Sequence, residues 1–210
     1  MAKIAVVGAG GWGTALAVMA NKYGNQVTIW TPFEEEAKAI RQHDEHKKLL
    51  PGVPVPPSIA LTTDLSAAAD ADLVIMAVPS FAVQSTADKL REVLKPGALI
   101  ANAGKGLEDN TYRRFSQVIG DAIPGARVVA LSGPSHAEEV GRGVPTTVVS
   151  ASDMPEAAEA VQDILMNPSF RIYVNRDLTG VELGGALKNV IALAAGICDG
   201  LDMGDNTKAA

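Results

Sequence analysis

The chain has 210 residues, 47% of them hydrophobic, which suffices for one large core. Acidic residues outnumber basic ones by 24 to 18, and this net charge of −6 disfavours a general nucleic-acid binder, so local donors must hold any anionic ligand. Three histidines and one cysteine exclude a Cys/His metal cluster and a disulfide framework. We expect a cytoplasmic protein without a bound metal, a nucleic-acid partner or a membrane-spanning segment.

Short apolar runs alternate with helical patterns through most of the chain. Strands are predicted at 4–7, 26–30, 59–62, 73–78, 98–102, 128–131, 146–149 and 171–174. Helices are predicted at 12–23, 34–46, 81–94 and 112–121, with another that begins at Pro155. Strands that alternate with helices form βαβ units, whose crossovers are almost always right-handed. The pattern predicts an α/β fold with a doubly wound, mostly parallel sheet of the Rossmann type.

The sequence changes character after residue 177. Residues 178–201 contain no proline, are rich in Leu, Ala, Val and Ile, and form a stretch too long for an ordinary crossover helix. We expect the central helix of an all-helical unit there, followed by an N-cap at Asp205–Thr207 and the start of one more helix. The expected domains are 1–177, which would bind a dinucleotide, and 178–210, the incomplete beginning of a helical substrate domain.

A glycine-rich turn supports the dinucleotide assignment. Gly8, Gly10 and Gly13 match G-x-G-x-x-G directly after the first predicted strand and at the start of the first predicted helix. Gly8 allows the tight turn, Gly10 lets the backbone approach a pyrophosphate, and Gly13 lets helix and strand pack closely. The N–H groups of the helical turn favour the anion. We expect NAD or NADP here, and a purely structural glycine turn is the weaker alternative.

The end of the second strand leaves the choice of cofactor open. An acid that would bind the ribose 2′-hydroxyl of NAD is not cleanly present, and no Arg or Lys stands there for the 2′-phosphate of NADP. Glu34, Glu35 and Glu36 follow the strand and would repel that phosphate, which favours NAD weakly. The alternative is that the three acids only complement the positive end of a helix.

Two further loops combine glycine with polar or charged residues at predicted strand ends, where ligands bind in such sheets. Lys105 lies between Gly104 and Gly106, a placement suited to contact with an anion or a carbonyl. Ser135 and Glu138 match the S-x-x-E capping box, so Ser135 has a structural interpretation. The other interpretation is that the same helix start offers the Ser135 hydroxyl and backbone N–H groups to a ligand.

One lysine interrupts the apolar C-terminal helix. Lys188 lies among Leu187, Val190 and Ile191, so we expect its side chain to be partly buried. Burial lowers the pKa of a lysine and so yields an ammonium that can exchange protons. Gly184 lies one turn before Lys188 and leaves room for a ligand. The alternative is a lysine that reaches from the flank of the helix into solvent.

Five segments carry a family resemblance. They are GAGGWGTALA at 8–17, LPGV at 50–53, NAGKGLE at 102–108, SGPSHAEEV at 132–140 and ELGGALKNVIALAAGICDGLDMGDNTKAA at 182–210. Together they resemble bacterial-type NAD(P)-dependent glycerol-3-phosphate dehydrogenases. The resemblance implies an oxidoreductase that interconverts dihydroxyacetone phosphate and sn-glycerol 3-phosphate for glycerophospholipid synthesis. It implies hydride transfer from the nicotinamide to the substrate carbonyl, with a lysine as general acid.

The resemblance also implies roles for individual residues. Lys188 matches the catalytic lysine and contacts the substrate, while Lys105 matches a lysine that touches both substrate and cofactor. The remaining implied substrate contacts are Gly133 and Ser135. The remaining implied cofactor contacts are Gly11, Trp12 and Ala137, with Phe33 beside the adenine.

The sequence departs from the family pattern because it ends at Ala210, before the acidic residue and the Arg-Asn pair that family members carry. We therefore expect a fragment or a truncated product. We expect its substrate to be a small phosphorylated molecule, and a homodimer is possible. The alternatives are a dinucleotide-binding fragment without catalysis, a ketopantoate- or hydroxyacid-type reductase, and a structural interaction protein. Lys105 and the 132–140 segment argue against the reductase, and the glycine turn argues against the structural protein.

Overall fold

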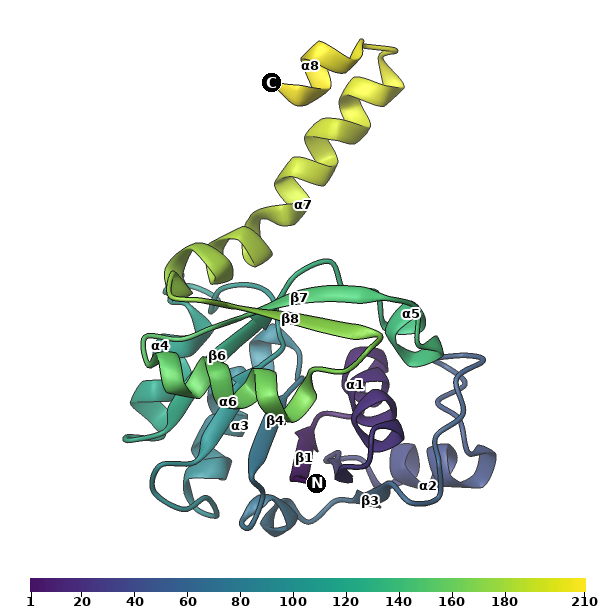
Figure 1. The fold of residues 1–210 in the computed structure, drawn as a ribbon, viewed down its shortest axis with the longest axis vertical. Coiled ribbons are helices and arrows are strands. Elements are labelled where there is room, and N and C mark those ends of the chain that lie inside the picture. The colour runs from purple at the N-terminus through teal and green to yellow at the C-terminus, as the bar shows by residue number, and fades with distance from the viewer.

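A single eight-stranded sheet organises the computed structural model, which describes residues 1–210 (Figure 1). The strands are β1 (Lys3–Val7), β2 (Gln26–Trp30), β3 (Ala60–Thr62), β4 (Leu73–Met76), β5 (Leu99–Asn102), β6 (Arg127–Ser132), β7 (Thr146–Ala151) and β8 (Phe170–Asn175). Their order is β3-β2-β1-β4-β5-β6-β7-β8, and every neighbouring pair is parallel except β6 and β7. The order reverses between β1 and β4, which confirms the predicted doubly wound, mostly parallel fold.

Helices cover both faces of this sheet. They are α1 (Gly11–Lys22), α2 (Glu34–His43), α3 (Val83–Arg91), α4 (Phe115–Ala122), α5 (Ala137–Arg142), α6 (Pro155–Leu165), α7 (Leu178–Gly200) and α8 (Asp205–Ala209), with 3-10 turns η1 (Leu65–Ala68) and η2 (Ser80–Ala82). Ile4 and Val6 of β1 join the core beneath α1, α5 and α6, whereas Ala5 and Val7 join the core beneath α3 and α4. The two-residue period of a strand thus supplies both cores from one apolar run.

Several predicted helices have different ends in the structure, such as α3, which was predicted at 81–94, and two of them differ for a clear local reason. α2 ends at His43 rather than at residue 46, because Asp44 adopts a left-handed conformation with φ of 46°. α4 begins at Phe115 rather than at residue 112, because Tyr112 has φ of 55° and Arg114 is the N-cap residue in an extended conformation. Left-handed residues interrupt a helix, and their positions are weakly encoded in an apolar pattern.

α7 leaves the sheet and projects away from it, so that the C-terminus lies far from the β-strands (Figure 1). Its first turn is well anchored: the Asp177 side chain accepts the Gly180 N–H at 2.8 Å, and Leu178 packs against Ala130 and Ala151. The large apolar side chains farther along are exposed, namely Leu187, Val190, Ile191, Leu193 and Ile197. Only the beginning of α7 is therefore fixed by packing against the rest of the chain.

Two expectations about the C-terminal segment need correction. The N-cap of α8 is Gly204 rather than Asp205, and no side chain caps that helix. By length and composition α7 could also cross a membrane, since it has 23 residues, a mean hydropathy of 1.5 in its most apolar stretch and 6% of that stretch buried. This is weak evidence, because helices of water-soluble proteins pass the same test. It nevertheless differs from the expectation that no segment could span a membrane.

Candidate active site

Gly8, Gly10 and Gly13, in the turn between β1 and α1, each have different steric surroundings. Gly8 has φ of 118°, and a Cβ there would lie 2.6 Å from the Ala77 carbonyl oxygen. A Cβ on Gly13 would lie 2.1 Å from the Gly8 carbonyl oxygen, so α1 can approach the turn only with glycine at this position. Gly10 is the extended N-cap residue of α1, and a Cβ there would meet nothing within 4 Å. Gly10 therefore borders open space at a helix N-terminus, where an anion is favoured.

A cavity of about 680 Å³ opens beside this turn, at the carboxyl ends of β1, β2, β4 and β5. Its walls come from the glycine turn at 8–12, the end of β2 at 30–33 with Glu36, the end of β4 at 77–79, and 103–105 after β5. This is the crevice in which doubly wound sheets bind dinucleotides, and its volume is typical of a ligand site. The open space at Gly10 and the helix N-terminus fit a pyrophosphate.

Exposed apolar side chains form the rim of this cavity. Phe33 is 65% exposed, Phe81 is 77% exposed and Leu49 is 44% exposed, and all three line the cavity. Phe33 was expected beside the adenine from the resemblance, whereas Phe81 and Leu49 were missed. Leu49 reaches the cavity because its loop lies against α1, where a Cβ on Gly11 would be 2.3 Å from the Leu49 carbonyl oxygen. Flat apolar surfaces of this kind suit a planar base.

Lys105 is held at the end of the cavity by two neighbours. Its Nζ donates to Ser135 Oγ at 2.8 Å and lies 5.7 Å from the centre of the Trp12 ring. The Trp12 Nε1–H in turn donates to the Ala103 carbonyl at 3.2 Å, which fixes the indole against the loop after β5. The structure thus brings together Trp12, Lys105 and Ser135, three residues that are far apart in the sequence.

The capping box expected at Ser135 and Glu138 is wrong. α5 begins at Ala137, its N-cap residue is His136, and no side chain caps it. The Ser135 hydroxyl instead donates to the Gly133 carbonyl at 3.1 Å and accepts from Lys105, and Glu138 contacts His136. The helix begins one residue too late for the pattern, so Ser135 belongs to the loop. Ala137 packs against the main core rather than lining the cavity.

A second cavity of about 410 Å³ lies between the β6–α5 loop and α7. Its lining residues are Lys105, Ser132, Gly133, Pro134, Val149, Gly180, Val181, Gly184, Gly185 and Lys188. A Cβ on Gly185 would lie 2.7 Å from Ser132 Oγ, so glycine lets α7 approach β6 closely. A Cβ on Gly184 would meet nothing within 4 Å, so this position leaves space beside Lys188. Lys105 lines both cavities and therefore lies between them.

The two lysines of the second cavity differ in environment. Lys105 is half-buried, and its pKa is lowered first by burial and then by the positive charge of Lys188. Lys188 is exposed, and its Nζ donates to Asn189 Oδ1 at 3.1 Å. The expectation of a partly buried Lys188 is therefore wrong for these 210 residues. The reason is that its apolar neighbours Leu187 and Val190 are themselves exposed and give it no cover.

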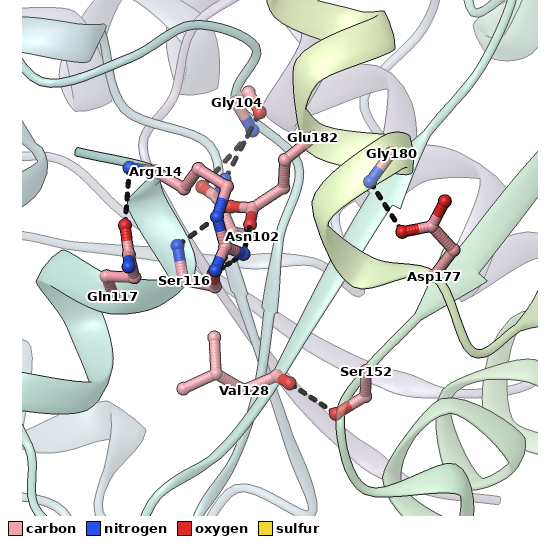
Figure 2. Close-up of polar contacts among 10 residues, drawn as sticks. All are labelled: Asn102, Gly104, Arg114, Ser116, Gln117, Val128, Ser152, Asp177, Gly180 and Glu182. Carbon is pink, nitrogen blue, oxygen red and sulfur yellow. Dashed lines mark hydrogen bonds and ion pairs between the residues drawn. The ribbon is translucent and has the colours of Figure 1, made fainter. Parts of the chain in front are cut away.

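Glu182 anchors α7 to the sheet domain, and sequence analysis missed it. Its side chain is 5% exposed; Oε2 accepts from Arg114 Nη1 at 2.7 Å, and Oε1 accepts the Ser116 N–H at 2.8 Å (Figure 2). The Ser116 hydroxyl adds a third hydrogen bond at 2.5 Å. A buried carboxylate is stable only with such partners. Its partners lie 66 and 68 residues earlier in the chain, so no local sequence signal could have identified the pair.

The fold, the glycine turn and the cavity at the switch point define a dinucleotide-binding domain of the Rossmann class. The family models for NAD-dependent glycerol-3-phosphate dehydrogenase match the chain twice, with the N-terminal model at residues 3–158 and the C-terminal model at 177–210. The chain belongs to the NAD-dependent glycerol-3-phosphate dehydrogenase family.

Individual relatives agree with this assignment. The chain is 52% identical over its full length to a glycerol-3-phosphate dehydrogenase [NAD(P)+] of Desulfitobacterium hafniense, of which it covers 60%. It is 54% identical over 99% of its length to the enzyme of that name from Moorella thermoacetica, of which it covers 62%. The chain thus spans about three fifths of the length of these relatives.

Solved structures give the same result in three dimensions. The crystal structure of glycerol-3-phosphate dehydrogenase from Coxiella burnetii matches 99% of this chain with a TM-score of 0.89 at 32% identity, and 64% of that protein is covered. The Saccharomyces cerevisiae enzyme matches 99% of this chain with a TM-score of 0.86 at 25% identity, and 65% of it is covered. α7 and α8 therefore have counterparts in both structures.

Proposed function

We propose that this sequence provides the cofactor-binding part and the catalytic lysine of an NAD(P)-dependent glycerol-3-phosphate dehydrogenase. The reaction interconverts dihydroxyacetone phosphate and sn-glycerol 3-phosphate, and its product feeds glycerophospholipid synthesis in the cytoplasm. The observation that carries the proposal is the position of Lys105, which lines both the dinucleotide cavity and the cavity that contains Lys188. We place the domain boundary between residues 177 and 178, a proposal supported by the start of the long helix α7 at Leu178.

The dinucleotide cavity would hold the pyrophosphate of NAD or NADP through backbone groups. Gly8, Gly10 and Gly11 with the N-terminus of α1 would bind the pyrophosphate, and Gly13 keeps that helix close to the sheet. Phe33 would pack against the adenine at the rim. The bound cofactor supplies hydride chemistry at its nicotinamide ring.

The second cavity would hold the phosphorylated substrate. Two cationic side chains, Lys105 and Lys188, line it and favour an anion. Gly133 lines it as well, and Ser135, whose hydroxyl donates to the Gly133 carbonyl, lies beside it and lines the dinucleotide cavity. Lys105 would contact both the substrate and the cofactor from this position. Lys188 would donate a proton to the substrate oxygen on carbonyl reduction and accept it in the reverse direction. A positive charge beside that oxygen also stabilises the negative charge that develops on it.

One observation favours a second candidate function for the 210-residue chain alone, a dinucleotide-binding module without catalysis. Lys188 is exposed, and the apolar side chains around it face solvent. A general acid acts efficiently, and a charge that develops on the substrate is strongly stabilised, where water is excluded. These residues alone do not exclude water from Lys188. The glycine turn and the strand ends that line the dinucleotide cavity lie within residues 1–210 and support nucleotide binding by this chain.

Two measurements test these candidates. The first is a titration of the chain with NADH and NADPH, which should show binding under both candidates. The second is oxidation of NADH with dihydroxyacetone phosphate, measured for the chain and for a fusion of residues 1–210 to the remaining C-terminal part of the Desulfitobacterium hafniense relative. Activity in the fusion supports the dehydrogenase. A fusion that binds NADH but never turns over would contradict it and leave the module.

A further inference from the structure

Three consecutive acids follow β2, and the structure separates them. Glu34 pairs with Lys38 at 2.9 Å and its side chain is 70% exposed. The Glu35 side chain is 91% exposed. The Glu36 side chain is 25% exposed, and among the three acids it alone lines the dinucleotide cavity. Of the three acids, Glu36 is therefore the one whose carboxylate would repel the 2′-phosphate of NADP.

The Glu36 carboxylate is held in a fixed orientation. The Thr31 hydroxyl donates to Oε2 at 2.5 Å, and Thr31 is fully buried at the end of β2. His46 Nε2 lies 3.5 Å from Oε1, and the His46 side chain is 7% exposed. His46 Nδ1 accepts the Leu49 N–H at 3.4 Å, and the buried His46 Nε2 makes no hydrogen bond. A hydrogen bond from the buried Thr31 thus orients one acid at the cavity wall, and the buried His46 ring lies beside it.

We propose that Glu36 is the residue that selects NAD over NADP, an assignment that rests on the proposed dinucleotide site. Glu36 follows Phe33 at the rim of the cavity and lies beyond the end of β2, the region of a doubly wound sheet that faces the adenosine ribose. A carboxylate there accepts a hydrogen bond from the ribose 2′-hydroxyl of NAD and repels the 2′-phosphate of NADP. Because the hydroxyl of the buried Thr31 holds it, the carboxylate stays at the cavity wall, where it would meet that phosphate.

The usual acid at the last residue of the second strand is replaced here by Trp30, whose indole N–H donates to the Thr63 carbonyl. Thr31 then supplies the hydroxyl that fixes an acid from the first turn of α2. Besides Lys105, one cation lines the same cavity, namely Lys89 of α3. It is exposed, and it is the group that would favour NADP if Glu36 did not dominate. Glu36 therefore favours NAD, whereas Lys89 favours NADP.

The test measures the dissociation constants of the 210-residue chain for NADH and NADPH. The variants are Glu36→Gln and, as a matched control, Glu35→Gln, which removes the same charge one residue away on an exposed side chain. We expect the unmodified chain to prefer NADH. Glu36→Gln should shift the affinity ratio toward NADPH by about tenfold or more, the scale of a contact to a charged group. Glu35→Gln should leave the ratio within about twofold, because an exposed charge is screened.

The outcomes separate this inference from the proposed function. An unchanged ratio in Glu36→Gln, or an equal shift in both variants, overturns the assignment to Glu36 while the dinucleotide site stands. A native preference for NADPH that Lys89→Met reverses also overturns it. An unmodified chain that binds neither nucleotide contradicts the proposed function and this inference together. Retained NADH binding in Glu36→Gln shows that the variant is folded.

Discussion

The Glu182 carboxylate of α7 accepts a hydrogen bond from Arg114, the N-cap residue of α4, at 2.7 Å in a nearly solvent-free contact. Lys188 lies six residues farther along the same helix, and most side chains from Leu187 onward are exposed. The contact therefore helps to fix the direction of α7 where it leaves the sheet. It links the position of Lys188 to a turn of the Rossmann domain that has no part in the dinucleotide cavity.

Replacing Glu182 with alanine should detach the start of α7. The substitution leaves Arg114 and the Ser116 N–H without their partner in a buried place, which we expect to cost about 2 kcal/mol or more. Hydrogen exchange at residues 180–186 should then be faster by roughly thirtyfold, while β1 and β4 stay protected. Asp199→Ala, which breaks an exposed pair with Lys208, is the control and should change little. Unchanged exchange in Glu182→Ala would contradict the anchoring role.

Lys105 should lose its proton at a lower pH than an ordinary lysine, because burial and the charge of Lys188 both disfavour its charged form. Competitive acetylation followed by mass spectrometry should therefore give a midpoint below the ordinary value of 10.5. Lys188→Met removes one of the two causes and should move the midpoint upward. The midpoint rises because the variant lacks the positive charge that disfavours the protonated form of Lys105. A midpoint that does not move would show that the two lysines are not electrostatically coupled.

The lowered Lys105 pKa also affects stability. The unfolded chain binds more protons than the folded chain between the folded pKa and the ordinary value, so stability should rise with pH across that window. The effect should be small, because the side chain is only half-buried and solvent screens its charge. Thermal unfolding of the chain and of Lys105→Met across alkaline pH would measure it. A pH slope that is the same in both proteins would refute this contribution.

Gly10→Val should abolish dinucleotide binding without unfolding the chain. The extended backbone at Gly10 accepts a side chain, but that side chain would enter the open space where the pyrophosphate is expected. NADH affinity should fall by at least about a hundredfold, because the contacts to the helix N-terminus are lost. Gly120→Val in α4, where a Cβ also meets nothing within 4 Å, serves as the control. Normal NADH binding in Gly10→Val would exclude the glycine turn as the pyrophosphate site.

Pro32→Arg should shift preference toward NADPH. Pro32 is exposed and lines the dinucleotide cavity beside Phe33, so an arginine there can reach a 2′-phosphate with two parallel hydrogen bonds. We expect the ratio of NADPH to NADH affinity to rise by about tenfold, and by more in combination with Glu36→Gln. Titration of each variant with both nucleotides checks this. An affinity ratio that stays the same would place the adenosine end of the cofactor elsewhere.

Lys188→Met should separate catalysis from cofactor binding in the fusion to the Desulfitobacterium hafniense C-terminal part. The substitution keeps much of the side-chain volume but removes the charge and the proton. Turnover should fall by roughly two orders of magnitude or more, the scale of a general acid, while NADH affinity stays near normal. The pH profile of carbonyl reduction should also lose one limb. Retention of about half the turnover would contradict the catalytic assignment, since a lysine that only reaches into solvent predicts that result.

The sequence by itself determined the fold class and the place of the glycine turn that borders the cavity proposed for the dinucleotide. Alternating apolar runs encode a doubly wound sheet, and the glycine turn sits at a fixed position relative to β1 and α1, because both signals are local. The ends of helices were predicted less well, since left-handed residues such as Asp44 and Tyr112 interrupt them without changing the apolar pattern. The capping box at Ser135 failed for a different reason, because α5 begins one residue later than the pattern requires.

Only the tertiary structure decided which side chains meet. Lys105 and Ser135, and Glu182 and Arg114, are pairs whose members come from different segments of the chain. Their partners are set by how elements pack across the sheet, which no short window of sequence contains. The exposure of Lys188 could also be known only from the tertiary structure. An apolar helix face indicates that another element can pack on the helix, but it does not identify that element. Burial is a property of neighbours in space, and those neighbours are distant in the chain.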